Sequence, residues 1–246
     1  MKTFFKRIVA LFCLVSLLTP AAAFANGAEM LFMVASMAAL PPAAPNIGDA
    51  YGGGFFAGYI SVAGNGIASH MLIVAPKATG ETNLAWDTGT GVVTGFTSVI
   101  DGPGNTAGLA ALGSRYAAAT WCKGRSIGGY TDWYLPAKNE LEVAYYNLKN
   151  VTQNNFSPGT YGQNANAVAP EPISTGYTAT QPAQTTVVAF RVGNSEAFAH
   201  YGFWSSTENS APYAWAQGFY SGTPGYQYDD TKTNDYYVRA FRRLSL

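Results

Sequence analysis

The sequence predicts an α+β domain in which two helices pack on short antiparallel strands, with a β-hairpin near its N-terminal end. Two apolar, β-prone runs flank the dipeptide Asn65-Gly66, which is typical of a hairpin turn. Two later segments carry apolar residues at helical spacing, and three short strand-like runs close the chain. We place this domain at residues 51–246.

The hairpin is predicted to consist of residues 55–62 and 67–75, with Pro76 ending the second strand. A glycine triplet, residues 52–54, precedes it. Because no Gly-Lys-Ser/Thr follows these glycines, they indicate a turn or bulge and not a phosphate-binding loop.

The first helix is predicted over residues 105–122. Leu109 and Tyr116 lie among apolar residues that recur at helical spacing. Asn105 or Thr106 can cap the start of this helix, since both types accept hydrogen bonds from the first backbone amides.

The second helix is predicted over residues 137–149, directly after Pro136, a residue type that suits a helix start. Leu141 belongs to its apolar stripe. We expect Glu140 and Glu142 to point away from that stripe or to lie at its edges.

A polar segment, residues 150–184, follows the second helix. A loop of this length in a compact domain is usually functional or an insertion. The strands beyond it are predicted at 203–207, 214–220 and 236–241, with loops at 208–213 and 221–235 between them.

The N-terminus is typical of a secretory signal peptide spanning residues 1–25. Basic residues precede an apolar run that is too short to cross a membrane, and an Ala-Phe-Ala cleavage site ends at Ala25. We expect cleavage near Ala25 and export to the periplasm, the cell surface or the medium. Residues 26–50 are predicted to form an apolar, Pro-rich arm, and Met30 leaves open an alternative start of translation.

The charge pattern argues against nucleic acid as a partner. The formal net charge is zero and charged residues make up only 11% of the chain, so no basic cluster reaches the density that nucleic acids require. The closest group, Arg239, Arg242 and Arg243, is expected to pair with carboxylates or backbone carbonyls.

The sequence favours binding over catalysis, and predicts no cofactor and no metal. No Gly-x-Ser-x-Gly elbow and no zinc-ligand spacing accompany the two histidines, His70 and His200. Cys122 is alone once the signal peptide is removed. It is predicted to be a buried, small apolar residue, with a reactive thiol as the alternative.

Three motifs occur in order in the second half of the chain. Residues 129–136, Gly-Tyr-Thr-Asp-Trp-Tyr-Leu-Pro, are followed by Glu140-Leu141. Residues 203–207, Phe-Trp-Ser-Ser-Thr, are followed by Ala214-Trp215 and by Tyr237-Val238-Arg239. Together they resemble the Trp-Arg-Leu-Pro…Glu-Leu and Trp-Ser-Ser-Thr…Ala-Trp…Val-Arg motifs of the Lcl C-terminal-domain family, over roughly residues 105–246. Residues 51–86 also resemble phage and prophage members.

This resemblance implies a C-type-lectin-like fold with a displayed loop region. Relatives of that fold include variable proteins of diversity-generating retroelements, phage receptor-binding proteins and formylglycine-generating enzymes. The paired thiols of those enzymes are missing here, so we do not expect their chemistry. The calcium-dependent sugar-binding motif is also incomplete, because Glu171-Pro172 is followed by Ile173 in place of an oxygen ligand.

Seven of the 16 tyrosines fall between Tyr201 and Tyr237, among Ser, Asn and Gly. This composition is typical of antibody binding loops, because tyrosine gives a large contact area at a small entropic cost. We therefore predict a surface that binds a cell-surface protein or glycan and consists of Asn209, Ser210, Tyr213, Gln217, Tyr220, Ser221, Tyr226, Tyr228, Asp229 and Asp230. The expected framework beneath it is Trp204, Trp215, Val238 and Phe241.

Two other interpretations remain open from the sequence. The tyrosines could simply pack a β-rich core and its loops. Alternatively, the chain could be a phage or prophage tail-tip component that is assembled in the cytoplasm from Met30. The sequence is compatible with an oligomer, both for an exported binding protein and for a phage component.

Overall fold

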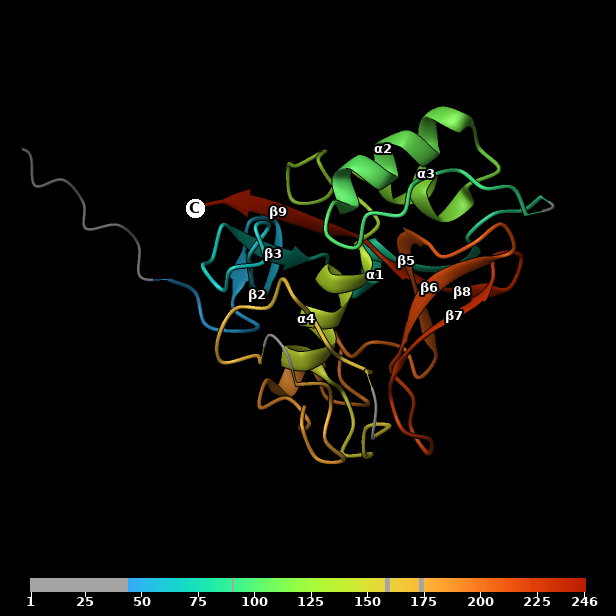
Figure 1. Cartoon of the computed structure of the whole chain (residues 1–246). Coiled ribbons are helices and arrows are strands. Elements are labelled where there is room, and N and C mark those ends of the chain that lie inside the picture. The colour runs from blue at the N-terminus through green and yellow to red at the C-terminus, as the bar shows by residue number, and fades with distance from the viewer. Residues whose placement is uncertain (1–43, 90, 158–159, 173–174) are drawn as a thin grey trace, which may run out of the picture. The chain divides into compact units, whose positions relative to one another are not determined.

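The computed structural model describes residues 44–246, except residues 90, 158–159 and 173–174 (Figure 1). The predicted signal peptide, the alternative start at Met30 and most of the predicted arm lie outside the described residues. Among the residues that are described, no helix is both long and apolar enough to cross a membrane.

Two sheets and four α-helices make up the described part of the chain, which is therefore of mixed α+β class. The first sheet has the order β1 (Ala50–Tyr51), β2 (Gly54–Ile60), β3 (His70–Val74), β9 (Phe241–Ser245). The second has the order β4 (Glu81–Ala85), β8 (Asp235–Arg239), β5 (Gly202–Glu208), β6 (Tyr213–Gly218), β7 (Gln227–Thr231). The helices are α1 (Lys77–Gly80), α2 (Gly102–Leu112), α3 (Ala117–Lys123) and α4 (Lys138–Leu148), with a 3₁₀ turn at Val188–Phe190.

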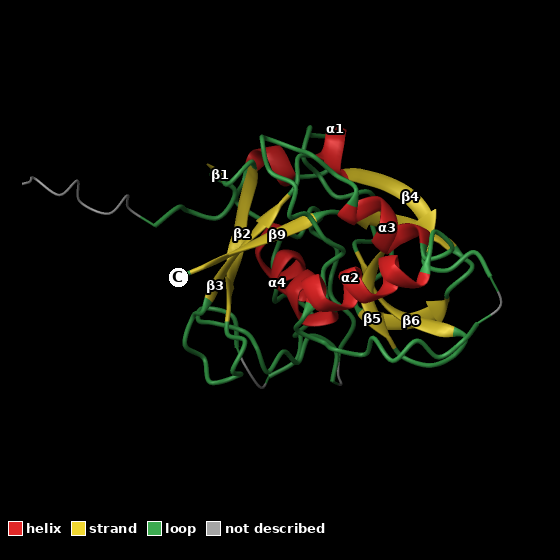
Figure 2. Ribbon diagram, turned by 90° about the horizontal axis from the view of Figure 1, so that it is seen from above, coloured by secondary structure: helices red, strands yellow, loops and turns green. Residues whose placement is uncertain are grey.

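Helix α4 lies between the two sheets (Figures 1 and 2). It contacts β2 on one side and β5 and β6 on the other. Leu141, Val143 and Leu148 are buried along it. Burying a side chain of this kind stabilises the fold by roughly 1.5–3 kcal/mol, so α4 joins the two sheets through a shared apolar core.

The predicted N-terminal hairpin is present, since β2 and β3 pair in antiparallel register from Phe55↔Val74 to Ile60↔His70. Its connection is longer than the two-residue turn that Asn65-Gly66 suggested, and spans residues 61–69. The side chain of Asn65 accepts a hydrogen bond from Ser61 Oγ at 2.8 Å, which shapes this loop from within.

The single helix predicted over residues 105–122 is two helices, α2 and α3. The break follows from Gly113, whose φ of 122° is in a region that favours glycine and cannot continue a helix. Asp101 caps α2 by accepting a hydrogen bond from the Gly104 amide at 3.1 Å. The predicted caps, Asn105 and Thr106, lie inside the helix and are buried.

The strand predicted at residues 236–241 is also divided into two. At Ala240 the chain passes from the second sheet to the first. The carbonyl of this residue accepts from the Ala75 amide and its amide donates to the Gly80 carbonyl. Strand β8 ends before this residue and β9 begins after it, next to β3.

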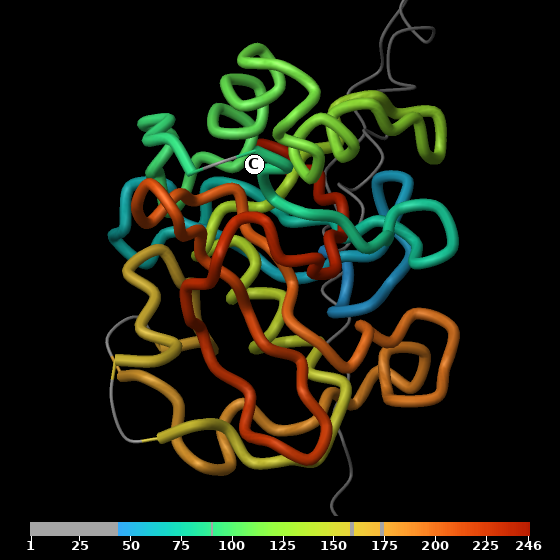
Figure 3. The backbone as a smooth tube through the Cα atoms, turned by 90° about the vertical axis from the view of Figure 1, so that its right-hand side faces the viewer, coloured from blue at the N-terminus to red at the C-terminus, as the bar shows by residue number. Residues whose placement is uncertain are grey.

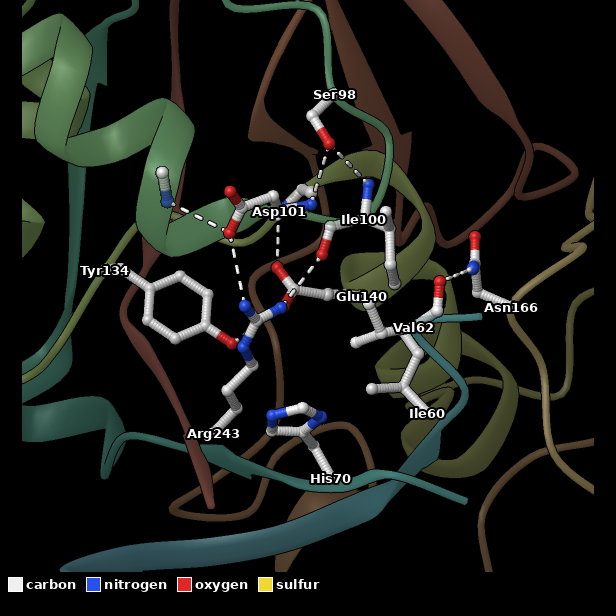
Figure 4. Close-up of polar contacts among 12 residues, drawn as sticks. Ile60, Val62, His70, Ser98, Ile100, Asp101, Tyr134, Glu140, Asn166 and Arg243 are labelled. Atoms are coloured by element: carbon white, nitrogen blue, oxygen red, sulfur yellow. Dashed lines mark hydrogen bonds and ion pairs between the residues drawn. The ribbon is translucent and has the colours of Figure 1, made fainter. Parts of the chain in front are cut away.

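The expectation for Glu140 and Glu142 is wrong, because both side chains are 0% exposed. Glu140 closes the start of α4 by accepting from the Ala137 amide at 2.8 Å, and it accepts from the Tyr134 hydroxyl at 2.9 Å (Figure 4). Burial raises the pKa of Glu140 to about 7. Arg243 lies beside it, 3.4 Å from Glu140 and 3.2 Å from Asp101 (Figure 4).

The structural role predicted for the C-terminal arginines is confirmed. Arg239 is buried and pairs with Glu196 at 2.8 Å and with Glu81 at 3.3 Å. Arg242 pairs with Asp132. Cys122 is fully buried in α3, and burial raises the pKa of its thiol, so it is the inert apolar residue that the sequence indicated.

Candidate ligand-binding surface

The tyrosine-rich C-terminal segment forms a β-hairpin, because the strand predicted at 214–220 is paired with a further strand, in a segment that the sequence predicted to be a loop. Strand β7 lies within the predicted loop 221–235 and pairs with β6 in antiparallel register, from Tyr213↔Thr231 to Gln217↔Gln227. It is an edge strand of the second sheet. In Figure 3 this hairpin, coloured orange to red, runs down the middle of the view.

Residues of this hairpin project to two opposite faces, because side chains alternate along a strand. Trp215 and Asp229 are directly paired, so they share one face with Tyr213. This face is turned toward α4, since Lys138 Nζ lies 3.7 Å from the centre of the Trp215 ring. Tyr228, between Gln227 and Asp229, projects to the other face.

The face that carries Tyr228 also carries a continuous group of aromatic rings. We call it the aromatic band, and it consists of Phe156, Tyr161, Tyr201, Tyr220, Tyr226 and Tyr228. All six side chains are exposed or half-buried. Each ring contacts at least one other member, with centroid distances from 5.0 Å (Tyr226 to Tyr228) to 6.4 Å (Tyr201 to Tyr220). Such tilted contacts are the favourable geometry for aromatic rings.

Two buried aromatic residues support the band from beneath. Tyr236 is buried and contacts Tyr228 at 6.0 Å and Tyr201 at 5.3 Å. Trp204, which is fully buried, contacts Tyr236 at 4.6 Å. The band therefore rests on the core of the second sheet, which fixes the position of its rings.

A hydrogen bond joins two of the hydroxyl groups of the band, and a second one anchors the Tyr236 hydroxyl beneath them. The hydroxyls of Tyr220 and Tyr228 bond to each other, and the hydroxyl of Tyr236 donates to Asp230. Burial, reinforced by the bond to Tyr220, raises the pKa of Tyr228, so its hydroxyl stays protonated. The Tyr228 hydroxyl is consequently neutral and can both donate and accept.

Phe156 and Tyr161 reach the band from the long polar segment after α4. The Phe156 amide donates to the Gly225 carbonyl at 3.0 Å, which attaches this segment to the hairpin. The Phe156 ring then lies 5.4 Å from Tyr226, and the Tyr161 ring lies 5.5 Å from it. Figure 3 shows this segment, in yellow to orange, beside the lower end of the hairpin.

A buried lysine holds the attachment point of that segment. Lys149 Nζ donates to Asn155 Oδ1 at 2.8 Å and to the carbonyls of Gln153 and Pro182. Burial lowers the pKa of Lys149 to about 8. Asn155 Nδ2 in turn donates to the Thr178 carbonyl, so one amine and one amide connect three parts of the segment.

A pair of buried carboxyl groups fixes the segment to α4 at a second place. Asn164 donates to Glu142 at 2.8 Å and lies 3.4 Å from Glu171. Glu142 Oε1 is buried without a hydrogen-bond partner, and the Glu171 carboxyl beside it can donate to Glu142 when Glu171 is protonated. Burial raises the pKa of both groups, and for Glu171 the charge of Glu142 raises it further.

The predicted binding residues fall into three groups in the structure. Tyr220, Tyr226 and Tyr228 belong to the aromatic band, and Asp230 and Ser221 flank it through Tyr236 and His200. Asn209 and Asp229 bond to each other at 2.8 Å away from the band, beside exposed Tyr213 and half-buried Ser210.

Gln217 does not belong to any exposed surface. Its side chain is 1% exposed and its Oε1 accepts from the Tyr177 hydroxyl, so the prediction that Gln217 is displayed is wrong. The predicted framework residues Trp204, Val238 and Phe241 are fully buried, and Trp215 is half-buried.

Three members of the band were not predicted, namely Phe156, Tyr161 and Tyr201. Phe156 and Tyr201 are 43% and 46% exposed. The signal available for the first two is an aromatic pair within an otherwise polar segment. Phe156 and Tyr161 join the band through their contacts with Tyr226. These residues are far apart in the sequence, so no local sequence pattern reveals the contacts.

Comparison with known proteins identifies the family. The model of the Lcl C-terminal domain matches residues 79–242, well over half of the chain. No curated protein matches. Among solved structures, a fimbrial protein from Bacteroides ovatus is similar at 14% sequence identity, with a TM-score of 0.43. That match covers 76% of this chain and 43% of the fimbrial protein, so this chain spans less than half of the fimbrial protein's length.

The matched residues include the motif at 129–136, the start of α4, and the whole β5–β8 sheet that supports the aromatic band. The chain therefore belongs to the Lcl C-terminal domain family.

Proposed function

We propose that this chain is an exported, adhesin-like binding protein that recognises its partner through the aromatic band, and that it is not an enzyme. One observation carries the proposal. Six aromatic side chains from separate parts of the chain form one partly exposed surface supported by buried Tyr236 and Trp204. Export rests on the signal-peptide pattern of residues 1–25.

The physical properties of the band suit binding. A tyrosine side chain offers a large amphipathic contact area and loses little entropy when it is held in place, since it has few rotatable bonds. The rings of the band already contact one another before any ligand arrives. A preorganised surface of this kind avoids much of the ordering cost of association.

We also propose that the fold is C-type-lectin-like. The proposal is supported by membership of the Lcl C-terminal domain family and by the resemblance of the motifs at 129–136 and 203–207. In such a fold the region between the core strands is the part that is displayed. The polar segment after α4, which lies between α4 and β5 in the chain, would be part of that region.

The decisive experiment compares two tyrosines on opposite faces of one hairpin. Tyr226 belongs to the band, whereas Tyr213 is 42% exposed on the opposite face. Labelled wild-type protein, Tyr226→Ala and Tyr213→Ala are applied to the cell or matrix surface to which the native protein attaches. Because truncation of a binding hot spot costs about 2 kcal/mol or more, we expect Tyr226→Ala to weaken attachment at least about 10-fold.

Tyr213→Ala should attach like the wild type. Thermal unfolding of all three proteins checks that the fold is intact. If Tyr226→Ala and the wild type are both folded and attach equally well, the aromatic band is not the binding surface.

A further inference from the structure

We infer that the ligand of the aromatic band is a neutral glycan chain and not a polyanion. This inference rests on the proposed function and names the ligand class for the same surface. It is drawn from the charges around the band, the chemistry of its rings and their spacing.

Cationic groups are missing from the part of the chain that builds the band. No lysine or arginine occurs between Asn150 and Phe190, and Lys232 is the only one between Tyr201 and Tyr237. Lys232 is 1% exposed and donates to Glu208 Oε1 at 2.5 Å and to two backbone carbonyls. Its charge is therefore neutralised inside the protein.

Basic residues that lie next to these segments in the chain or contact them make their contacts within the protein. Lys149 donates to Asn155 Oδ1 and to two carbonyls, and Lys138 lies over the Trp215 ring, on the face of the hairpin opposite the band. Arg191 donates to the carbonyls of Thr185 and Thr186. Lys77 donates to the Ala197 carbonyl at 2.6 Å and lies 3.6 Å from Glu81. Sulfate, phosphate and carboxylate groups are recognised mainly by arginine and lysine donors, and the band offers none for a sulfated or sialylated ligand.

The charge that flanks the band is negative. Asp230 accepts from the Tyr236 hydroxyl beneath the band and from Asn234 Nδ2. Carboxylates repel an anionic ligand, but they are good acceptors for uncharged hydroxyl groups. His200 and Ser221, joined at 2.9 Å, add further polar groups next to Tyr201 and Tyr220.

The rings supply what a sugar chain needs in addition to these polar groups. A pyranose has an apolar C–H face and a rim of hydroxyls, so it can stack on a tyrosine ring and bond to neighbouring polar atoms. The rings of Phe156, Tyr226 and Tyr228 follow one another at centroid distances of 5.4 Å and 5.0 Å and so form one continuous aromatic surface. An extended chain of sugars can contact more than one ring of this surface.

The test uses an array of immobilised glycans with three classes of probe: neutral plant, fungal and bacterial polysaccharides, heparin, and sialylated oligosaccharides. The full mature protein is applied at low and at high salt. We expect binding to at least one neutral polysaccharide, no binding to heparin, and less than a twofold change with salt, because only charge–charge attraction is screened. Tyr226→Ala should lower that binding at least about 10-fold, and Tyr213→Ala should leave it unchanged.

Two results would overturn the inference. One is salt-sensitive binding to heparin or to sialylated probes. The other is a failure to bind any neutral probe, combined with a particular pattern of attachment to the native surface. In that pattern, treating the surface with protease abolishes attachment, whereas oxidising the sugars of the surface with periodate does not. If Tyr226→Ala then still weakens that attachment, the aromatic band stands as a binding surface and only the ligand class is wrong.

A Tyr226→Phe variant separates the two contributions of the ring. It keeps the stacking face and loses only the hydroxyl group. If stacking dominates, this variant should retain more than half of the wild-type affinity. A loss equal to that of Tyr226→Ala would contradict the stacking argument.

Discussion

The ring of Phe156 lies 5.4 Å from the ring of Tyr226, although the first belongs to the polar segment after α4 and the second to the hairpin near the C-terminus. This contact joins the two parts of the proposed binding surface. Phe156 is 43% exposed, so part of its ring is available to a ligand, and it belongs to neither of the two hydrophobic core clusters.

The first prediction follows from this position. Phe156→Ala should weaken ligand binding by about 3- to 30-fold, which corresponds to roughly 0.7–2 kcal/mol. It should change the thermal midpoint by no more than a few degrees, because Phe156 lies outside the hydrophobic core. Val188, an exposed apolar residue outside the band, provides the matched control as Val188→Ala. Titration calorimetry against the bound glycan gives the affinity, and equal losses in the two variants would contradict the prediction.

The second prediction concerns Lys149, whose amine bonds to Asn155 and to two carbonyls in the buried base of the polar segment. Lys149→Met keeps the apolar stem but leaves these acceptors without a donor. An unsatisfied buried acceptor costs about 1–3 kcal/mol, so we expect the free energy of unfolding to fall by about 2–4 kcal/mol.

The same change should also weaken binding, since Asn155 precedes Phe156 and positions it. Denaturant unfolding and ligand titration measure the two effects separately. Lys123→Met, at an exposed position of α3, is the control that removes a lysine without breaking a buried contact. A Lys149→Met protein as stable as this control would show that the amine is dispensable.

The third prediction concerns the buried pair Glu142 and Glu171. Because burial raises the pKa of both carboxyls, the native state holds a proton that the unfolded chain releases above its ordinary pKa of about 4.3. The pair therefore contributes most stability below that pH, and the contribution is lost as pH rises through the native-state pKa.

Glu171→Gln replaces the shared proton with an amide donor that does not titrate. We expect this variant to be more stable than the wild type above neutral pH, by about 1–3 kcal/mol, and to lose this advantage near pH 4. Urea unfolding between pH 4 and 9 measures the difference. In Glu171→Gln the free energy of unfolding should still fall as the pH rises toward 7, because the pKa of Glu140 is raised to about 7. Asp235→Asn, on an exposed carboxylate, should show no such gain.

The fourth prediction separates the two open interpretations of the N-terminus. An exported protein that is cleaved after Ala25 begins at Asn26, whereas a virion component made from the alternative start begins at Met30. N-terminal sequencing of the native protein distinguishes them. We expect Asn26, and a protein that begins at Met30 would favour assembly in the cytoplasm.

Local patterns predicted those parts of the fold that local forces determine. The N-terminal hairpin and helix α4 follow from runs of apolar residues with a regular period, and the structure contains both. The division of the first helix was missed because a single glycine, Gly113, outweighs the helical period on either side of it. The burial of Glu142 was missed because its partners, Asn164 and Glu171, lie in a segment that has no regular pattern.

The same limit explains the binding surface. Composition alone indicated a tyrosine-rich surface, and three of its six members, Tyr220, Tyr226 and Tyr228, were predicted. The pairing of β6 with β7 decides which side chains share a face of the hairpin. Because strand β7 was not predicted from the sequence, this register could not be predicted either. Gln217 was placed on the surface for this reason, whereas the register directs it into the core.

The β6–β7 hairpin has a consequence for how such a surface can change over generations. Its two strands are held together by backbone hydrogen bonds, and small buried residues, Ala214 and Ala216, occupy the middle of β6. Substitutions at the outward positions of β7 therefore alter the chemistry offered to a partner while the backbone and the core beneath it keep their structure. A lineage can acquire new partners through the outward side chains of β7 without having to re-evolve its scaffold.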